Sequence, residues 1–147
     1  FMKFIYPAII HDDADGFWAE FPDLEYTSST GSTLTELVTN AQEAMELYIL
    51  GALEDGERLP KSSNINELSI EDDFPFKEDP EMKDYYVLNK SFVSMVVVDL
   101  REYLDSSTLI KKTLSIPKWA NDVAVKYNIN FSQLLTNAIA EETIKYK

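Results

Sequence analysis

Residues 109–139 constrain the fold more than any other stretch, because they pattern as one short strand followed by two short helices. Alternation in residues 109–116 places polar side chains on one face and mostly apolar side chains on the other. One strand and two short helices cannot cover a strand edge or bury enough apolar surface on their own. The pattern therefore predicts a homodimer through residues 109–147, in which two strands pair as an antiparallel ribbon over four helices.

The two predicted helices each begin with a recognised start signal. Pro117 suits the first turn of one helix, and Asn130, with Gln133 three residues later, is a typical cap for the other. Their apolar positions repeat with helical spacing, which indicates one buried stripe on each helix. The residues expected in the dimer core are Leu114, Ile116, Trp119, Val123, Leu134, Leu135 and Ile139. The alternative is an ordinary strand-helix-helix piece of a mixed domain.

The first hundred residues predict an α+β domain of order β-β-β-α-β. The expected strands are residues 3–10, 17–21, 26–30 and 92–100. Residues 12–16 are expected to form the first turn, with Gly16 tolerating a positive φ. Thr33 and Glu36 make a capping-box pattern, and the apolar spacing that follows predicts a helix that ends by residues 55–56 and lies on the sheet.

Charge divides the chain in the same way. Residues 1–90 carry 20 Asp and Glu against 6 Lys and Arg, a net charge of −14, whereas residues 91–147 carry 6 against 7. This asymmetry predicts two modules with different partners, of which the acidic one repels phosphate and attracts a basic protein; simple solubility is the alternative. The expected organisation is a domain at 2–100, which includes an irregular acidic segment at 57–84, a connection at 101–108 and a domain at 109–147.

Composition excludes several classes of site. The chain has no cysteine and a single histidine, His11, so disulfides, thiolate nucleophiles and zinc sites built on cysteine or paired histidines are excluded. No cofactor and no metal are expected. No apolar run approaches 18 residues and no charged-then-apolar leader begins the sequence, which predicts a cytoplasmic protein.

The acidic residues around the first turn leave an enzymatic alternative open. Carboxylate oxygens bind Mg²⁺ in nucleases, and five acids are candidates: Asp12, Asp13, Asp15, Glu20 and Asp23. A solvated turn explains them equally well, because three of them lie in one turn while a nuclease site draws acids from separated strands. Trp18 faces away from Phe17 and Phe21 by alternation, so it either packs on the helix-free side of the sheet or anchors a partner. The lone His11 is expected to be structural or solvated rather than catalytic.

Three stretches also carry a family resemblance. "YPAIIHDDADGFWAEFPDL" and "GSTLTELVTNAQEAMELYILG" are together similar to the N-terminal domain of the HicB antitoxins. "IPKWANDVAVKYNINFSQLLTNAI" resembles the ribbon-helix-helix tail that a subset of that family carries. The resemblance implies a partial RNase H-like domain that has no enzymatic activity of its own and sequesters HicA, a small basic RNA-cleaving toxin. It also implies a tail that represses the shared operon.

The resemblance assigns roles to individual residues. In a ribbon-helix-helix dimer the polar face of the ribbon enters the major groove of operator DNA, so Lys111, Thr113 and Ser115 would read base edges. The backbone amides around Asn130, Phe131 and Ser132 would hold a phosphate. The candidates for contact with the toxin are Asp12, Asp13, Asp15, Trp18 and Glu20. The alternatives to this antitoxin and autorepressor are a metal-dependent nuclease with a degenerate RNase H-like centre and a plain ligand-responsive ribbon-helix-helix repressor.

Overall fold

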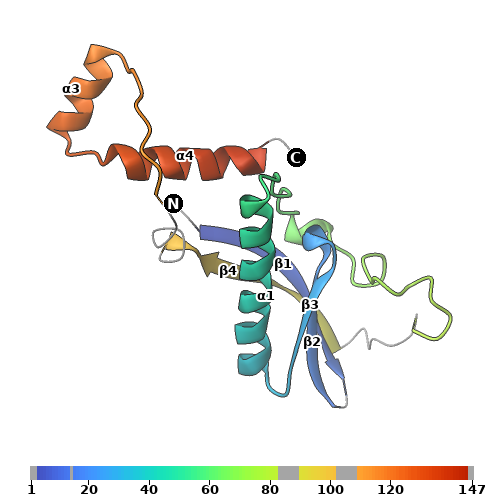
Figure 1. Ribbon diagram of the computed structural model, residues 1–147. Coiled ribbons are helices and arrows are strands. Elements are labelled where there is room, and N and C mark those ends of the chain that lie inside the picture. The colour runs from blue at the N-terminus through green and yellow to red at the C-terminus, as the bar shows by residue number, and fades with distance from the viewer. Residues whose placement is uncertain (1–2, 14, 83–89, 102–108, 146–147) are drawn as a thin grey trace.

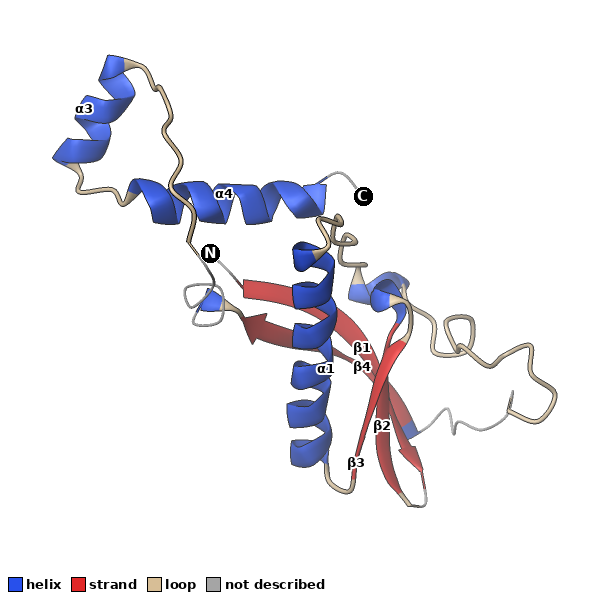
Figure 2. Cartoon of the chain, in the orientation of Figure 1, coloured by secondary structure: helices blue, strands red, loops and turns tan. Residues whose placement is uncertain are grey.

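A four-stranded antiparallel sheet with one long helix on one face makes up the N-terminal part of the chain (Figures 1 and 2). The computed structural model describes residues 3–13, 15–82, 90–101 and 109–145. The strands are β1 (Lys3–Asp13), β2 (Gly16–Phe21), β3 (Thr27–Gly31) and β4 (Ser91–Asp99), and they lie in the order β3-β2-β1-β4. The predicted α+β class and the β-β-β-α-β order are confirmed.

The hairpin between β1 and β2 is tighter than the sequence predicts. Its ladder continues through the pairs His11–Trp18 and Asp12–Phe17 to a last pair of Asp13 with Gly16. Gly16 has a φ of 146°, which L side chains rarely adopt, so the positive φ expected at this position is present. The prediction that the first strand ends at residue 10 was therefore wrong by three residues, and Asp12 and Asp13 belong to β1.

Helix α1 (Leu34–Glu54) begins with the predicted capping pattern. The Thr33 hydroxyl accepts a hydrogen bond from the Glu36 amide at 3.1 Å, while the Glu36 carboxylate accepts one from the amide of Ser32 at 2.9 Å. The start of α1 crosses the end of β3 so closely that a Cβ on Gly31 would lie 2.4 Å from the backbone nitrogen of Leu37. A residue without a side chain is therefore required where β3 meets α1.

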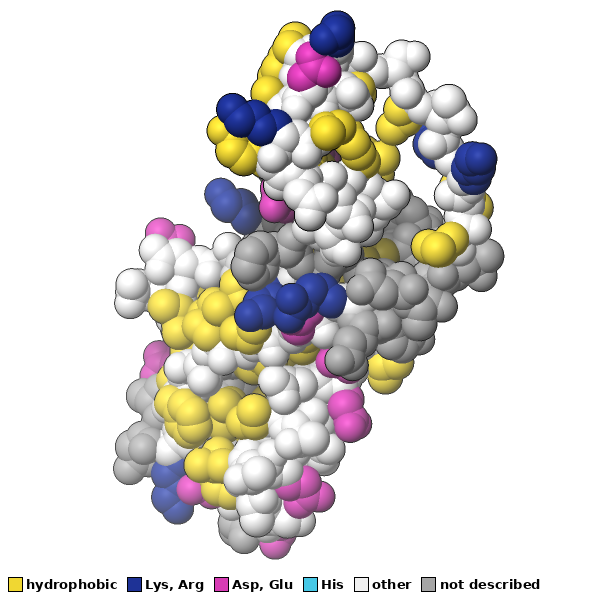
Figure 3. Space-filling model, turned by 90° about the vertical axis from the view of Figure 1, so that its left-hand side faces the viewer, with side chains coloured by type: hydrophobic (Ala, Val, Ile, Leu, Met, Phe, Trp, Pro, Cys, Tyr) yellow, Lys and Arg dark blue, Asp and Glu magenta, His cyan; other side chains and the backbone are white. Residues whose placement is uncertain are grey.

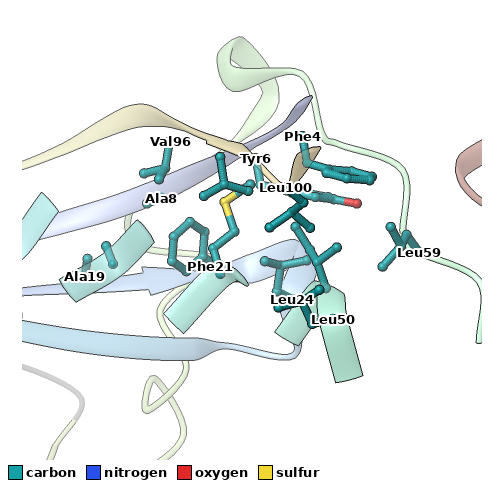
Figure 4. Close-up of a cluster of buried hydrophobic side chains, with 14 of the residues drawn as sticks. Phe4, Tyr6, Ala8, Ala19, Phe21, Leu24, Leu50, Leu59, Val96 and Leu100 are labelled. Carbon is teal, nitrogen blue, oxygen red and sulfur yellow. The ribbon is translucent and has the colours of Figure 1, made fainter. Parts of the chain in front are cut away.

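The hydrophobic core lies between α1 and the sheet face that it covers (Figure 4). The predicted inward positions of β2 are confirmed, because Ala19 and Phe21 are buried and Phe17 packs against the core. Alternate residues of β1 and β4 point to the same side. The main core residues are Phe4, Tyr6, Ala8, Ile10, Leu37, Ala41, Met45, Ile49, Val96 and Val98.

Residues 57–82, the described part of the segment after α1, contain one short 3-10 turn, η2 (Ile65–Glu67), and are otherwise irregular. They are nevertheless tied to the sheet domain. The Tyr6 hydroxyl donates a hydrogen bond to the carbonyl of Pro60 at 2.6 Å, and both carboxylate oxygens of Asp23 accept hydrogen bonds from Ser63. Because this segment runs back along the domain, β4 begins beside the end of β1 and pairs with it antiparallel.

The C-terminal part consists of α3 (Lys118–Lys126) and α4 (Phe131–Lys145), which project from the sheet domain (Figure 1). Both predicted helices are confirmed. Residues 109–117 form an extended stretch that belongs to no sheet in the single chain, and the strand expected at 109–116, which would pair with a second copy, stays a prediction. A strand exists through its ladder hydrogen bonds, and one copy of the chain offers this stretch no ladder partner among the described residues.

No helix in the described part of the chain is both long enough and apolar enough to span a bilayer.

Candidate functional site

An acidic pocket that is open to solvent lies between the end of the β1–β2 hairpin and the start of α1. Its volume is about 490 Å³, and its lining includes the carboxylates of Asp13, Asp15 and Glu36. Asp13 is held in place because its carboxylate accepts a hydrogen bond from the amide of Asp15 at 2.8 Å. Trp18 is also among the lining residues. A surface with three carboxylates is suited to a cationic side chain.

The five predicted toxin-contact residues are only partly brought together. Asp13, Asp15 and Trp18 line this pocket, while Asp12 is half-buried on the strand beside it. Glu20 is 0% exposed, so it does not lie on this surface. The reason is that residues of the segment after α1 cover the sheet face that carries Glu20. The alternation of apolar and polar residues in β2 does not reveal this cover.

Trp18 has a packing role on that covered face. Its ring stacks on His11 with 4.0 Å between centroids, and Phe74 contacts it edge-on at 6.0 Å. Phe74 is buried and also meets the His11 ring at 6.0 Å. Packing on the helix-free side, one of the two roles considered for Trp18, is therefore present in the structure.

His11 and Glu20 form a buried polar pair beneath these rings. The Nδ1 atom of His11 lies 2.8 Å from the Ser91 hydroxyl, and its Nε2 atom lies 3.6 Å from a carboxylate oxygen of Glu20. The latter distance is too long for a good hydrogen bond but is within ion-pair range. Burial raises the pKa of Glu20, His11 counteracts part of that rise, and the carboxylate of Asp73 adds to it.

This cluster was only partly foreseen from the sequence. His11 was expected to be structural or solvated, and it is structural, whereas Glu20 was placed among surface residues because a glutamate on an outward strand position is usually solvated. The signal was the pair Phe74 and Phe76 within an acidic segment, because aromatic residues in such a segment indicate an apolar surface that they cover.

The order Ser91, His11, Glu20 has the form of a hydrolase relay, but its geometry does not suit catalysis. The imidazole is 1% exposed under Trp18 and Phe74, so a substrate carbonyl cannot approach it. The five acids considered for Mg²⁺ are also dispersed, since Glu20 is buried and Asp23 is bonded to Ser63. Within the described ranges, no three His, Cys, Asp or Glu side chains are grouped so as to hold a metal ion.

The extended stretch at 109–117 presents two different faces. Lys112, Leu114 and Ile116 line a groove of about 540 Å³ together with residues of α3 and α4. The predicted base readers Lys111, Thr113 and Ser115 are exposed and are absent from the groove lining. The two faces of this stretch therefore carry the residues expected for them, although the stretch pairs with no other strand in the single chain.

The C-terminal part leaves most of its apolar side chains in solvent. Each of the seven residues predicted for the dimer core is at least 40% exposed, and Trp119 is 69% exposed. Hydrophobic side chains are visible on its surface beside lysine side chains (Figure 3). An apolar surface of this extent on two short helices indicates a missing partner.

The start of α4 is capped as predicted. The Asn130 side-chain oxygen accepts a hydrogen bond from the Gln133 amide at 3.1 Å. Because this cap occupies Asn130, the amides of Phe131 and Ser132 are the groups left for a phosphate at this helix end, and their contact with DNA stays a prediction.

Comparison with known proteins gives one family and several similar chains. The family described as "HicB_like antitoxin of bacterial toxin-antitoxin system" matches residues 6–118. An uncharacterized 14.9 kDa protein from the rep-hol intergenic region of Haemophilus phage HP1 is 34% identical over 110 residues, which are 75% of this chain and 72% of the phage protein.

Solved structures are similar over nearly the whole chain. A chain of a toxin–antitoxin complex from Streptococcus pneumoniae is 40% identical with a TM-score of 0.66, and the match covers 96% of this chain and 99% of that one. The Burkholderia pseudomallei antitoxin HicB is 21% identical with a TM-score of 0.58, covering 95% and 98% of the two chains, and it supports the fold alone.

Proposed function

The chain belongs to the family of HicB-like antitoxins of bacterial toxin–antitoxin systems, and from this we propose that it binds and inhibits a small basic HicA-like toxin. We also propose that residues 109–147 form a ribbon-helix-helix homodimer that binds operator DNA and represses the operon. The observation that carries the antitoxin role is the 40% identity to a chain of a toxin–antitoxin complex over almost its full length. In this proposal the protein is cytoplasmic and not an enzyme, and residues 2–100 form a partial RNase H-like domain.

Charge supports the assignment of the toxin to the N-terminal domain. Residues 1–90 carry a net charge of −14, so their field attracts a basic protein and repels nucleic acid. The acidic pocket at the hairpin end offers Asp13 and Asp15 to lysine or arginine side chains of the toxin. An antitoxin bound there through carboxylates competes directly with RNA phosphate for the same cationic groups.

The exposed apolar surface supports the dimer. Pairing residues 109–117 with the same stretch of a second copy supplies the missing ladder, and the apolar residues beside it become the core between the copies. Lys111 and Thr113 then lie on the outer face of the ribbon, away from the groove that Leu114 lines. A two-stranded ribbon with such a face fits the major groove.

The toxin interaction is tested by calorimetry of the full chain with the purified product of the neighbouring gene. The double variant Asp13→Asn/Asp15→Asn should weaken binding at least tenfold at low salt and by less at high salt. The matched control is Glu43→Gln/Glu46→Gln, which removes the same charge from α1. Equal weakening by both pairs would mean that net charge, rather than the pocket, carries the interaction.

A further inference from the structure

The sheet face opposite α1 is also covered. Its cover is a short acidic turn rather than a helix. Ser69 and Asp73 define this turn through two hydrogen bonds: the Asp73 amide donates to the Ser69 carbonyl at 2.9 Å, and the Ser69 amide donates to the Asp73 carboxylate at 2.8 Å. Phe74 follows at once and is 1% exposed. The turn is thus fixed to the sheet by one aromatic anchor.

The sheet face that Phe74 covers also carries a buried carboxylate, Glu20, without hydrogen-bond donors among the described residues. Neither side-chain oxygen of Glu20 accepts a hydrogen bond from a described residue, and the Nε2 atom of His11 lies 3.6 Å from one of these oxygens. A buried carboxyl group costs much more free energy when it is ionised than when it is protonated. The closed arrangement therefore favours uncharged Glu20.

The other titratable groups at this cluster come from each element around it. His11 stands on β1, Glu20 on β2, and Asp73 on the covering turn. Tyr26 precedes β3; burial raises the pKa of its phenol, and Asp73 and Glu20 raise it further. Ser91 on β4 bonds to His11 but carries no charge. Of the groups that act on Glu20, His11 stabilises its charged form, while Asp73, on the turn itself, opposes it.

We propose that Glu20, His11 and Phe74 form a proton-sensitive latch, in which protonated Glu20 keeps residues 69–76 closed over the sheet and ionised Glu20 favours their release. Ionisation places a negative charge on buried Glu20, where the carboxylate of Asp73 opposes it, and opening relieves this because the Glu20 carboxylate becomes hydrated and separates from Asp73. The latch couples pH to the exposure of Trp18 and to the position of the acidic turn.

The direction follows from proton linkage. The pKa of Glu20 is higher in the closed state than in the open state, so the closed state binds the proton more tightly. Closure is therefore fully stabilised below the open-state pKa and weakens as the pH rises toward the closed-state pKa. Between these two values the opening equilibrium should rise by up to about tenfold per pH unit, and above them it should level off.

Hydrogen exchange of the full chain tests the latch. The amides of Asp73 and Lys77 report opening, because both donate to backbone carbonyls within the covering segment. The observable is the exchange rate of residues 69–77 in wild type divided by the rate in Glu20→Gln at the same pH, so that intrinsic exchange cancels. We expect this ratio to rise with pH and then to reach a plateau. A ratio that stays constant across the titration would overturn the latch.

Two further variants separate the latch from a general effect of charge. Glu43→Gln removes an exposed carboxylate from α1 and should keep the full pH dependence of the wild type. Phe74→Ala removes the anchor and hydrates Glu20, so residues 69–77 should exchange rapidly and without added pH dependence. If Glu20→Gln does not fold, the exchange rates of residues 69–77 are compared between wild type and Phe74→Ala instead. The same pH dependence of exchange in both proteins would refute the proposal.

Discussion

Replacement of Gly31 by alanine should destabilise the sheet domain, because the start of α1 occupies the space of its missing side chain. An added Cβ would lie 2.4 Å from the backbone nitrogen of Leu37 and 2.7 Å from its Cα. Carbon atoms pack best at about 3.5–4.0 Å, so α1 must move by about 1 Å relative to β3. The obstacle is backbone and cannot rotate away. We expect a cost of about 2–3 kcal/mol, the upper range for overpacked sites.

Gly51 provides the matched control. It lies within α1, and a Cβ there meets nothing within 4 Å, so Gly51→Ala should stabilise the helix by about 0.5–1 kcal/mol. Urea unfolding of the full chain, followed by circular dichroism, measures both changes. The reasoning would be refuted if Gly31→Ala unfolded within 0.5 kcal/mol of wild type, since the close contact between β3 and α1 would then be absent in solution.

The remaining predictions concern the C-terminal part. Lys111→Ala should cost about 1–3 kcal/mol of operator binding and relax discrimination at one position in each half-site, whereas Lys112→Ala should weaken operator and scrambled duplex about equally; fluorescence anisotropy at two salt concentrations checks both. Leu135→Asp should abolish the dimer, and light scattering that still finds a dimer would point to the sheet edge as the interface. Asn130→Ala should lower the stability of the α4 region by about 1 kcal/mol through loss of its cap, and thermal unfolding with unchanged stability would contradict that role.

The sheet domain was predictable because its local signals and its packing agree. The alternation at Phe17, Ala19 and Phe21 assigns the core face of β2, and the capping pattern at Thr33 fixes where α1 begins. These signals depend on neighbours in sequence, so one chain carries all the information. Gly31 shows the limit, because its role arises only when α1 is placed across β3.

The buried cluster was not predictable for a related reason. Glu20 sits on a position of β2 that would be solvated in a sheet with one open face, and this face is covered by Phe74, which packs on His11 and Trp18 from a segment distant in sequence. An irregular segment has no periodicity from which such a contact can be inferred. Glu20 was interpreted as a surface residue because outward positions of a strand are usually solvated. The turn that covers this position could not be seen in the sequence.

The missing strand at 109–116 has a consequence for how repression would respond to concentration. If the ribbon forms only between two copies, a single chain has no DNA-reading surface, and operator occupancy depends on dimer formation as well as on DNA affinity. Below the dimer dissociation constant, occupancy should rise with the square of antitoxin concentration, and above it linearly. A covalent tandem of two chains should restore the linear dependence at low concentration. If operator binding by the natural chain were linear throughout a range in which light scattering shows monomers, the reading element would not be a ribbon shared between copies.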